Sequence, residues 1–324
     1  MDIYVKKAII HQFSPDDTDL YLADKFLNIT PKIEEYLRKK IERVYSDEAK
    51  TGIFEENNPF LEMVSDDLLE TSVAVANRWK EEFIISENQK TNDLVFVQFS
   101  KEGVDHFAFL RIALRETLTH LGGEVDNPIK LTQNNLPGFG TGADEALVIN
   151  LQSRKYHLIE KRIKYNGTFL NYFSENLLQT QPTISPKKSI KALEKTAQKI
   201  AESFNTDDFQ FQSKVKSAIF NHIEEENKLS PEKLADDLFD DNLTARLSFI
   251  DQVKEAVPEP VTFEEIDVSR QLKKFENQKL SLSNGIELIV PNNVYEDAES
   301  VEFILNENGT YSILIKNIED IQSK

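Results

Sequence analysis

No cysteine occurs among the 324 residues of this chain. This absence excludes disulfide bonds, thiolate zinc sites and cysteine nucleophiles. No apolar run reaches the roughly 18 residues of a membrane-spanning helix, so we expect no membrane partner. The first residues, MDIYVKK, lack the basic and then apolar pattern of a secretory signal. Together these absences favour a cytoplasmic protein.

Motifs that mark common active sites are also missing. No Gly-x-Ser-x-Gly sequence occurs, and the 5 histidines form neither His-x-x-x-His nor His-Glu-x-x-His pairs. The glycine cluster at 138–142 (GFGTG) follows a polar stretch rather than a strand, so it is interpreted as a mobile surface loop and not as a phosphate loop. We expect no enzyme activity, no cofactor and no metal; a hydrolase of nucleotides or nucleic acid is the least favoured alternative.

Positive charge is scarce overall but concentrated in one stretch. The chain has a formal net charge of −18, yet residues 154–204 hold ten basic and four acidic residues. Charge segregated in this way indicates a binding surface or a solvated face. The acidic remainder repels nucleic acid at long range, so any DNA contact must be local. Four aspartates between 236 and 241 lack the spacing of a calcium loop and are interpreted as a solvated, partner-facing patch.

The pattern of the first 165 residues predicts a sheet with helices packed against it. Thr30-Pro31 opens one helix, because threonine caps a helix and proline suits its first position. A second helix is expected over residues 59–82, with Trp79 as a core anchor. Segments rich in β-branched and aromatic residues are expected as strands: 2–13, 19–29, 94–99, 106–114, 129–132 and 146–151.

After residue 166 the periodicity becomes helical and continues to about residue 257. Pro258-Glu259-Pro260 is the best linker signal. Beyond it, Asn284-Gly285 and Asn308-Gly309 each lie between strand-like runs, which predicts two β-hairpins with positive φ at both turn positions. The expected fold class is therefore α+β, with an N-terminal domain of mixed sheet and helices (1–165), a helical middle segment (166–257) and a small antiparallel β-rich C-terminal domain (261–324).

A homodimer is expected from an apolar cluster at the start of the helical segment. One short stretch carries Phe169, Tyr172, Phe173, Leu177 and Leu178, more apolar surface than a short helix usually needs. The alternative, that these side chains bury against the N-terminal sheet, is nearly as well supported.

The stretch from 186 to 204 predicts the most informative helix. Lys188, Lys191, Lys195 and Lys199 share one side, here termed the lysine face, and apolar residues fill the opposite side. Lysines at this spacing repel one another, so a binding surface and a solvated face are about equally favoured. Upstream lies a basic stem interleaved with aromatic residues, a composition that suits phosphates. The candidate DNA-binding residues are Arg154, Lys155, Lys161, Arg162 and Lys164 of the basic stem, with Lys187, Lys188, Lys191, Lys195 and Lys199.

Several segments taken in order resemble one protein family. The first is Arg43-Val44-Tyr45-Ser46 followed by Gly52-Ile53-Phe54-Glu55, and the second is the run from Glu160 to Tyr165 leading into Phe169-Leu170-Asn171-Tyr172-Phe173. The third is Val261-Thr262-Phe263 followed by Arg270-Gln271-Leu272-Lys273-Lys274-Phe275. All three are similar to segments of the bacterial 37-kDa nucleoid-associated proteins (NdpA type). The mass of 37.3 kDa agrees. The resemblance implies a non-enzymatic protein of the bacterial nucleoid, in the cytoplasm, that associates with double-stranded DNA and needs no cofactor.

A second function remains open beside DNA binding. The strong acidity also fits a protein-interaction module that binds DNA-handling enzymes, with its carboxylates mimicking a phosphate backbone.

Overall fold

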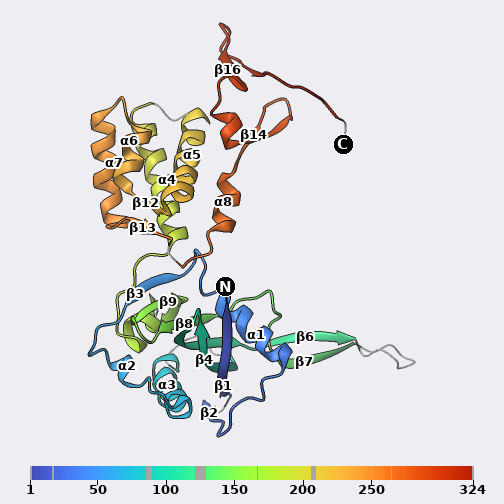
Figure 1. The fold of residues 1–324 in the computed structure, drawn as a ribbon, viewed down its shortest axis with the longest axis vertical. Coiled ribbons are helices and arrows are strands. Elements are labelled where there is room, and N and C mark those ends of the chain that lie inside the picture. Colours follow the sequence, from blue (N-terminus) through green and yellow to red (C-terminus); the bar gives the residue numbers. More distant parts are fainter. Residues whose placement is uncertain are drawn as a thin grey trace. The chain divides into compact units, whose positions relative to one another are not determined.

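The computed structural model describes residues 2–16, 18–84, 90–120, 129–165, 167–205, 209–263 and 265–322. The chain divides into two compact units, Met1–Ser185 and Pro186–Lys324 (Figure 1). Helices and strands both contribute substantially, and the main sheet is antiparallel, so the predicted α+β class is confirmed.

The first unit is built on a seven-stranded sheet in which every neighbouring pair is antiparallel. Glu102 and Gly103 both have positive φ in the tight turn between β4 (Asn92–Lys101) and β5 (Val104–Ala113). The strand order is β2 (Asp19–Tyr21), β1 (Ile3–Ser14), β4 (Asn92–Lys101), β5 (Val104–Ala113), β8 (Glu145–Asn150), β9 (Lys155–Ile159) and β3 (Lys50–Ile53).

Both faces of this sheet are covered. Leu94 and Phe96 of β4 lie in a core with α3 (Leu68–Phe83), which contributes the fully buried Trp79. Val95 and Val97, which point the other way, lie in a second core with α1 (Pro31–Glu42). Because successive side chains of a strand alternate between faces, a strand covered on both sides is apolar throughout. This explains the continuous run LVFVQF.

Two predictions for this unit are wrong in detail. The expected helix over 59–82 is two helices, α2 (Pro59–Glu62) and α3, because Asn58 and Asp67 each cap a separate helix start with a side-chain oxygen. The expected strand over 19–29 is limited to β2. The helix beginning at Thr30-Pro31 is confirmed, and the Thr30 hydroxyl accepts the Ile33 N–H.

The segment after residue 166 is not helical at its start. Strands β10 (Ile163–Tyr165) and β11 (Thr168–Leu170) form a hairpin, followed by a π-helix, η1 (Phe173–Leu177). Four of the five side chains expected at a dimer interface are buried in the core under α3: Tyr172, Phe173, Leu177 and Leu178. They therefore offer no apolar surface to a second copy. The structure agrees with the alternative, in which these side chains bury against the N-terminal sheet.

A two-stranded arm extends from the first unit (Figure 1). It consists of β6 (Arg115–His120), which the sequence did not predict, and β7 (Ile129–Asn135). All six residues of β6 are exposed, so its polar sequence shows no buried-strand pattern.

The second unit begins with a helical group: α4 (Pro186–Ser203), α5 (Phe209–Glu226), α6 (Pro231–Leu238) and α7 (Leu243–Ala256). Leu193, Ile219 and Phe249 from three of these helices meet in its core, and α8 (Ser269–Phe275) contributes Phe275. Strands β12 (Lys228–Leu229) and β13 (Val261–Thr262) pair across the group.

The C-terminal part contains both predicted hairpins. They are β14 (Asn277–Ser281) with β15 (Glu287–Pro291) and β16 (Val301–Leu305) with β17 (Tyr311–Ile315), separated by α9 (Asn292–Tyr295). The turn prediction is wrong in one respect. Gly285 and Gly309 have φ of 86° and 80°, whereas neither preceding asparagine is among the described residues with positive φ. A type I turn followed by a left-handed glycine has this pattern.

Candidate nucleic-acid interface

The basic stem lies in the first unit, on β9, β10 and the residues around them. Arg154 pairs with Glu56 at 3.2 Å, and Lys161 pairs with Asp144 at 2.7 Å. The Arg162 guanidinium donates to the Phe169 carbonyl at 2.9 Å and lies over the Phe169 ring. These three side chains have partners within the first unit. Lys161 and Arg162 are nevertheless exposed, as are Lys155 and Lys164.

The one acidic residue within the basic stem is turned inward. The Glu160 side chain is 1% exposed, and its Oε1 forms a salt bridge with Lys50 Nζ at 2.5 Å. Its other oxygen accepts the Ser174 N–H at 2.9 Å, and the Ser174 hydroxyl also donates to the carboxylate at 2.9 Å. Because this carboxylate is paired and buried, it reduces the positive potential of the stem's basic side chains less than an exposed carboxylate would. The sequence alone gave no sign of this orientation.

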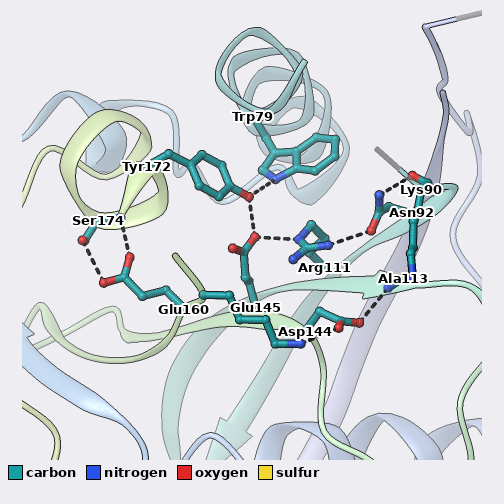
Figure 2. Close-up of polar contacts among 11 residues, drawn as sticks. Trp79, Lys90, Asn92, Arg111, Ala113, Asp144, Glu145, Glu160, Tyr172 and Ser174 are labelled. Carbon is teal, nitrogen blue, oxygen red and sulfur yellow. Dashed lines mark hydrogen bonds and ion pairs between the residues drawn. The ribbon is translucent and has the colours of Figure 1, made fainter. Parts of the chain in front are cut away.

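A buried polar network fixes the start of β8, the residue directly after Asp144. The Arg111 Nε donates to Glu145 Oε2 at 2.6 Å, and the Tyr172 hydroxyl donates to the same oxygen (Figure 2). The Trp79 indole N–H donates to the Tyr172 hydroxyl at 3.1 Å. These hydrogen bonds tie strands β5 and β8 to α3 and η1. They also offset part of the cost of burying the Arg111–Glu145 ion pair.

The neighbouring Asp144 links this network to the basic stem. Burial alone would raise the pKa of Asp144, but hydrogen bonds from Lys161 and from the Ala113 N–H outweigh burial and hold that pKa below its usual value. Lys161 is consequently positioned by an ionised partner (Asp144 is drawn in Figure 2).

The lysine face lies in the second unit, on α4. The predicted amphipathic helix is confirmed: Ile190, Leu193 and Ala197 are buried, whereas the candidate lysines Lys187, Lys188, Lys191, Lys195 and Lys199 are exposed. Lys199 donates to the Gln252 side chain of α7 at 3.0 Å. The basic stem and the lysine face thus belong to different units, although they are close in sequence.

Two further lysines add positive charge beside α4. Burial raises the pKa of Glu194, and the charges of Lys216, Lys274 and Lys191 act against this rise. Lys216 lies on α5 and Lys274 on α8, so three helices contribute cations around one carboxylate. The sequence could not indicate these two residues, since only helix packing brings them near α4.

The residues that the structure describes include no group of three or more His, Asp or Glu side chains able to hold a metal ion. Three of the four clustered aspartates pair within the second unit: Asp236 with Arg246 at 3.0 Å, Asp237 with His222 at 2.6 Å, and Asp240 with Lys214 at 3.1 Å. Internal pairing therefore accounts for most of the patch that was interpreted as facing a partner.

The glycine-rich loop lies at the surface and is bound to α1 through its carbonyl groups. The buried Lys40 Nζ donates to the carbonyls of Gly138 at 2.9 Å and Pro137 at 3.3 Å, and also to that of Thr141. A phosphate loop presents backbone N–H groups to its ligand. This loop presents carbonyl oxygens to an ammonium group, which agrees with the rejection of the phosphate-loop interpretation.

Comparison with known proteins identifies the family. The family model described as "Nucleoid-associated protein YejK" matches residues 9–321. The match spans nearly the whole chain, so the chain belongs to this family of nucleoid-associated proteins, and the resemblance found in the sequence is confirmed. No similar sequence was found among curated proteins. No helix in the described ranges combines the length and the apolar character needed to cross a bilayer.

Proposed function

We propose that this protein is a non-enzymatic component of the bacterial nucleoid, in the cytoplasm, that binds double-stranded DNA without a cofactor. The lysine face and the basic stem would contact the phosphate backbone. Such contacts release condensed counterions and provide affinity without sequence readout.

One observation carries this proposal. The lysine face of α4 is exposed along its whole length, and Glu194, an acidic residue of the same helix, is only partly exposed. The chain has a net charge of −18, yet the lysines of this face lie close enough together to repel one another, which is unfavourable in the absence of a ligand. A phosphate backbone would relieve that repulsion. Membership of a nucleoid-associated family supports the same ligand.

The direct test is binding to duplex DNA at low salt. Fluorescence anisotropy with labelled duplexes of unrelated sequence should show similar affinities, which should fall steeply as salt rises. No binding to any duplex at low salt would contradict the proposal.

A second candidate function rests on the C-terminal part. Residues 277–322 carry eight carboxylates and two lysines. The same part exposes large apolar side chains: Ile286, Ile289, Ile304, Leu305, Tyr311, Leu314, Ile315, Ile318 and Ile321. An acidic surface with exposed apolar residues suits a protein partner with a basic surface, such as a DNA-handling enzyme. This alternative takes over if the protein binds no duplex while such an enzyme co-purifies with it.

A homodimer is part of the proposal, held by a surface other than the expected one. The exposed apolar residues of the C-terminal part replace the buried cluster around Tyr172 as its candidate interface. Two copies would present two lysine faces to one duplex. Light scattering at micromolar concentration should give twice the chain mass; a monomer mass would contradict the dimer.

A further inference from the structure

Cations also gather where the β6–β7 arm leaves the first unit, outside both candidate surfaces. Arg115 begins β6, and Arg43 follows directly after α1. The buried Lys40 lies within the field of both: burial, together with the charges of Arg43 and Arg115, lowers the pKa of Lys40 to about 8. Three positive groups therefore lie near one another at the root of the arm.

The backbone at this root is held firmly. The loop between β7 and β8 is tied to α1 by Lys40 and by the Tyr36 hydroxyl, which donates to the Pro137 carbonyl at 3.0 Å. Arg43 passes close to the same loop, since a Cβ added at Gly142 would lie 3.7 Å from Arg43 Cδ. The root is thus preorganised, which lowers the entropy lost on binding a ligand.

An open cleft of about 710 Å³ lies at this root. Its lining includes Lys90 and Arg115, with the side chains of Gln133 and Asn134 from the arm. The two carboxylates in the cleft are already engaged. Glu116 accepts from Gln133 at 3.1 Å, and Asp144 accepts from Lys161 at 2.7 Å.

The cations of the root differ from their neighbours on α1. Within the described ranges, no carboxylate forms an ion pair with Arg43, Lys90 or Arg115. By contrast, Arg38 pairs with Glu42 at 3.8 Å and Lys39 with Glu35 at 3.4 Å. Lys90 and Arg115 line the cleft together with amide donors, and Arg43 lies against the neighbouring loop at Gly142. Unpaired cations in such a setting are suited to a phosphate group.

We propose that Arg43, Lys90 and Arg115 form a second phosphate-binding site, at the root of the β6–β7 arm, which contacts the backbone of bound duplex DNA. This inference rests on the proposed DNA-binding function but uses none of the candidate residues of the basic stem or the lysine face. The site gives the first unit a DNA contact in addition to that of the basic stem. The cations hold phosphate oxygens, and Gln133 and Asn134 supply further donors.

The test is the triple variant Arg43→Gln, Lys90→Gln, Arg115→Gln in the full chain. Each phosphate contact contributes about 0.9 to the slope of log affinity against log salt, so the slope should flatten by up to ~2.7. A charge-matched control replaces three cations that are already paired: Lys6→Gln, Arg38→Gln, Lys39→Gln. The control should change the slope much less. Thermal unfolding of both variants checks that the fold is retained.

The outcomes separate this site from the proposed function. Equal flattening in the two triple variants would show a general effect of net charge and overturn the site. An unchanged slope in the first variant, with binding lost when the lysine face is neutralised, would overturn the site and leave the proposed function standing. A wild-type protein that binds no duplex overturns both. Calorimetric titration with inorganic phosphate distinguishes a small-anion site: saturable phosphate binding that the triple variant loses, without any effect on DNA, would also overturn the proposal.

Discussion

The Tyr172 hydroxyl donates a hydrogen bond to Oε2 of Glu145, the same carboxylate oxygen that accepts from Arg111. Glu145 is fully buried, and the Arg111 side chain is 8% exposed. One carboxylate therefore satisfies a buried cation and a buried phenol, and joins η1 to the central sheet.

Glu145→Ala should destabilise the first unit strongly. The change leaves the Arg111 charge buried without a partner, and removal of one member of a buried ion pair costs about 3–5 kcal/mol. Urea unfolding measures this free energy. Glu175→Ala, at an exposed position on η1, is the control and should stay within about 0.5 kcal/mol. A loss below about 1 kcal/mol for Glu145→Ala would contradict the role given to this carboxylate.

Gly52→Ala should also be destabilising, for a steric reason. A Cβ at this position would overlap the Tyr156 ring and hydroxyl, and Tyr156 is buried. Overpacking of this kind costs about 1–3 kcal/mol. Gly138→Ala is the matched control, because a Cβ there meets nothing within 4 Å. Equal unfolding midpoints for the two variants would show that the close approach of β3 to Tyr156 is not needed.

Stability should fall as the pH drops below the usual pKa of histidine, in part because of His11. Burial lowers the pKa of His11 below 6.5. The ring is held as a neutral group, since Nδ1 accepts the Ala23 N–H at 3.0 Å and Nε2 meets the Ser72 hydroxyl at 2.9 Å. Below pH 6.5 the unfolded chain takes up a proton that the folded state resists, so unfolding is favoured.

The variant His11→Gln isolates this effect, because glutamine keeps a donor and an acceptor but does not titrate. Its free energy of unfolding should change less than that of the wild type between about pH 7.5 and about pH 5.5. Identical pH dependence in the two proteins would exclude His11 as the cause.

The extent of the first domain can be tested with fragments. The sequence placed its end at residue 165, and the three-part division stays a proposal. Since Tyr172, Phe173, Leu177 and Leu178 pack in the core under α3, we expect the fragment 1–185 to unfold cooperatively in urea. The fragment 1–165 lacks these side chains and should lose the cooperative transition. Cooperative unfolding of both fragments would support the boundary at 165.

Local signals predicted much of this fold. Thr30-Pro31 marks the start of an observed helix, because capping and proline act within a few residues. The amphipathic pattern of α4 likewise follows from the sequence alone. Most of the central strands were also predicted, because their segments are locally rich in β-branched and aromatic residues.

Features set by contacts between distant residues were not predictable. The aromatic residues before α4 look helical and available for a partner, but their burial depends on Trp79 and Glu145, remote in the chain. The inward turn of Glu160 needs Lys50. Lys216 and Lys274 join the surroundings of the lysine face only through the packing of α5 and α8. Neither periodicity nor spacing carries this information.

The central claim is that the lysine face contacts DNA phosphates. The most direct measurement is the salt dependence of duplex binding by the variant with Lys188, Lys191, Lys195 and Lys199 all changed to Gln. Four lost contacts should flatten the slope of log affinity against log salt by up to ~3.6, and weaken binding to every duplex alike. A charge-matched variant with four other exposed lysines changed to Gln (Lys25, Lys32, Lys254 and Lys279) should keep most of the wild-type slope. An unchanged slope in the first variant, or the same change in both, would contradict the account and leave the lysine face as a solvated surface.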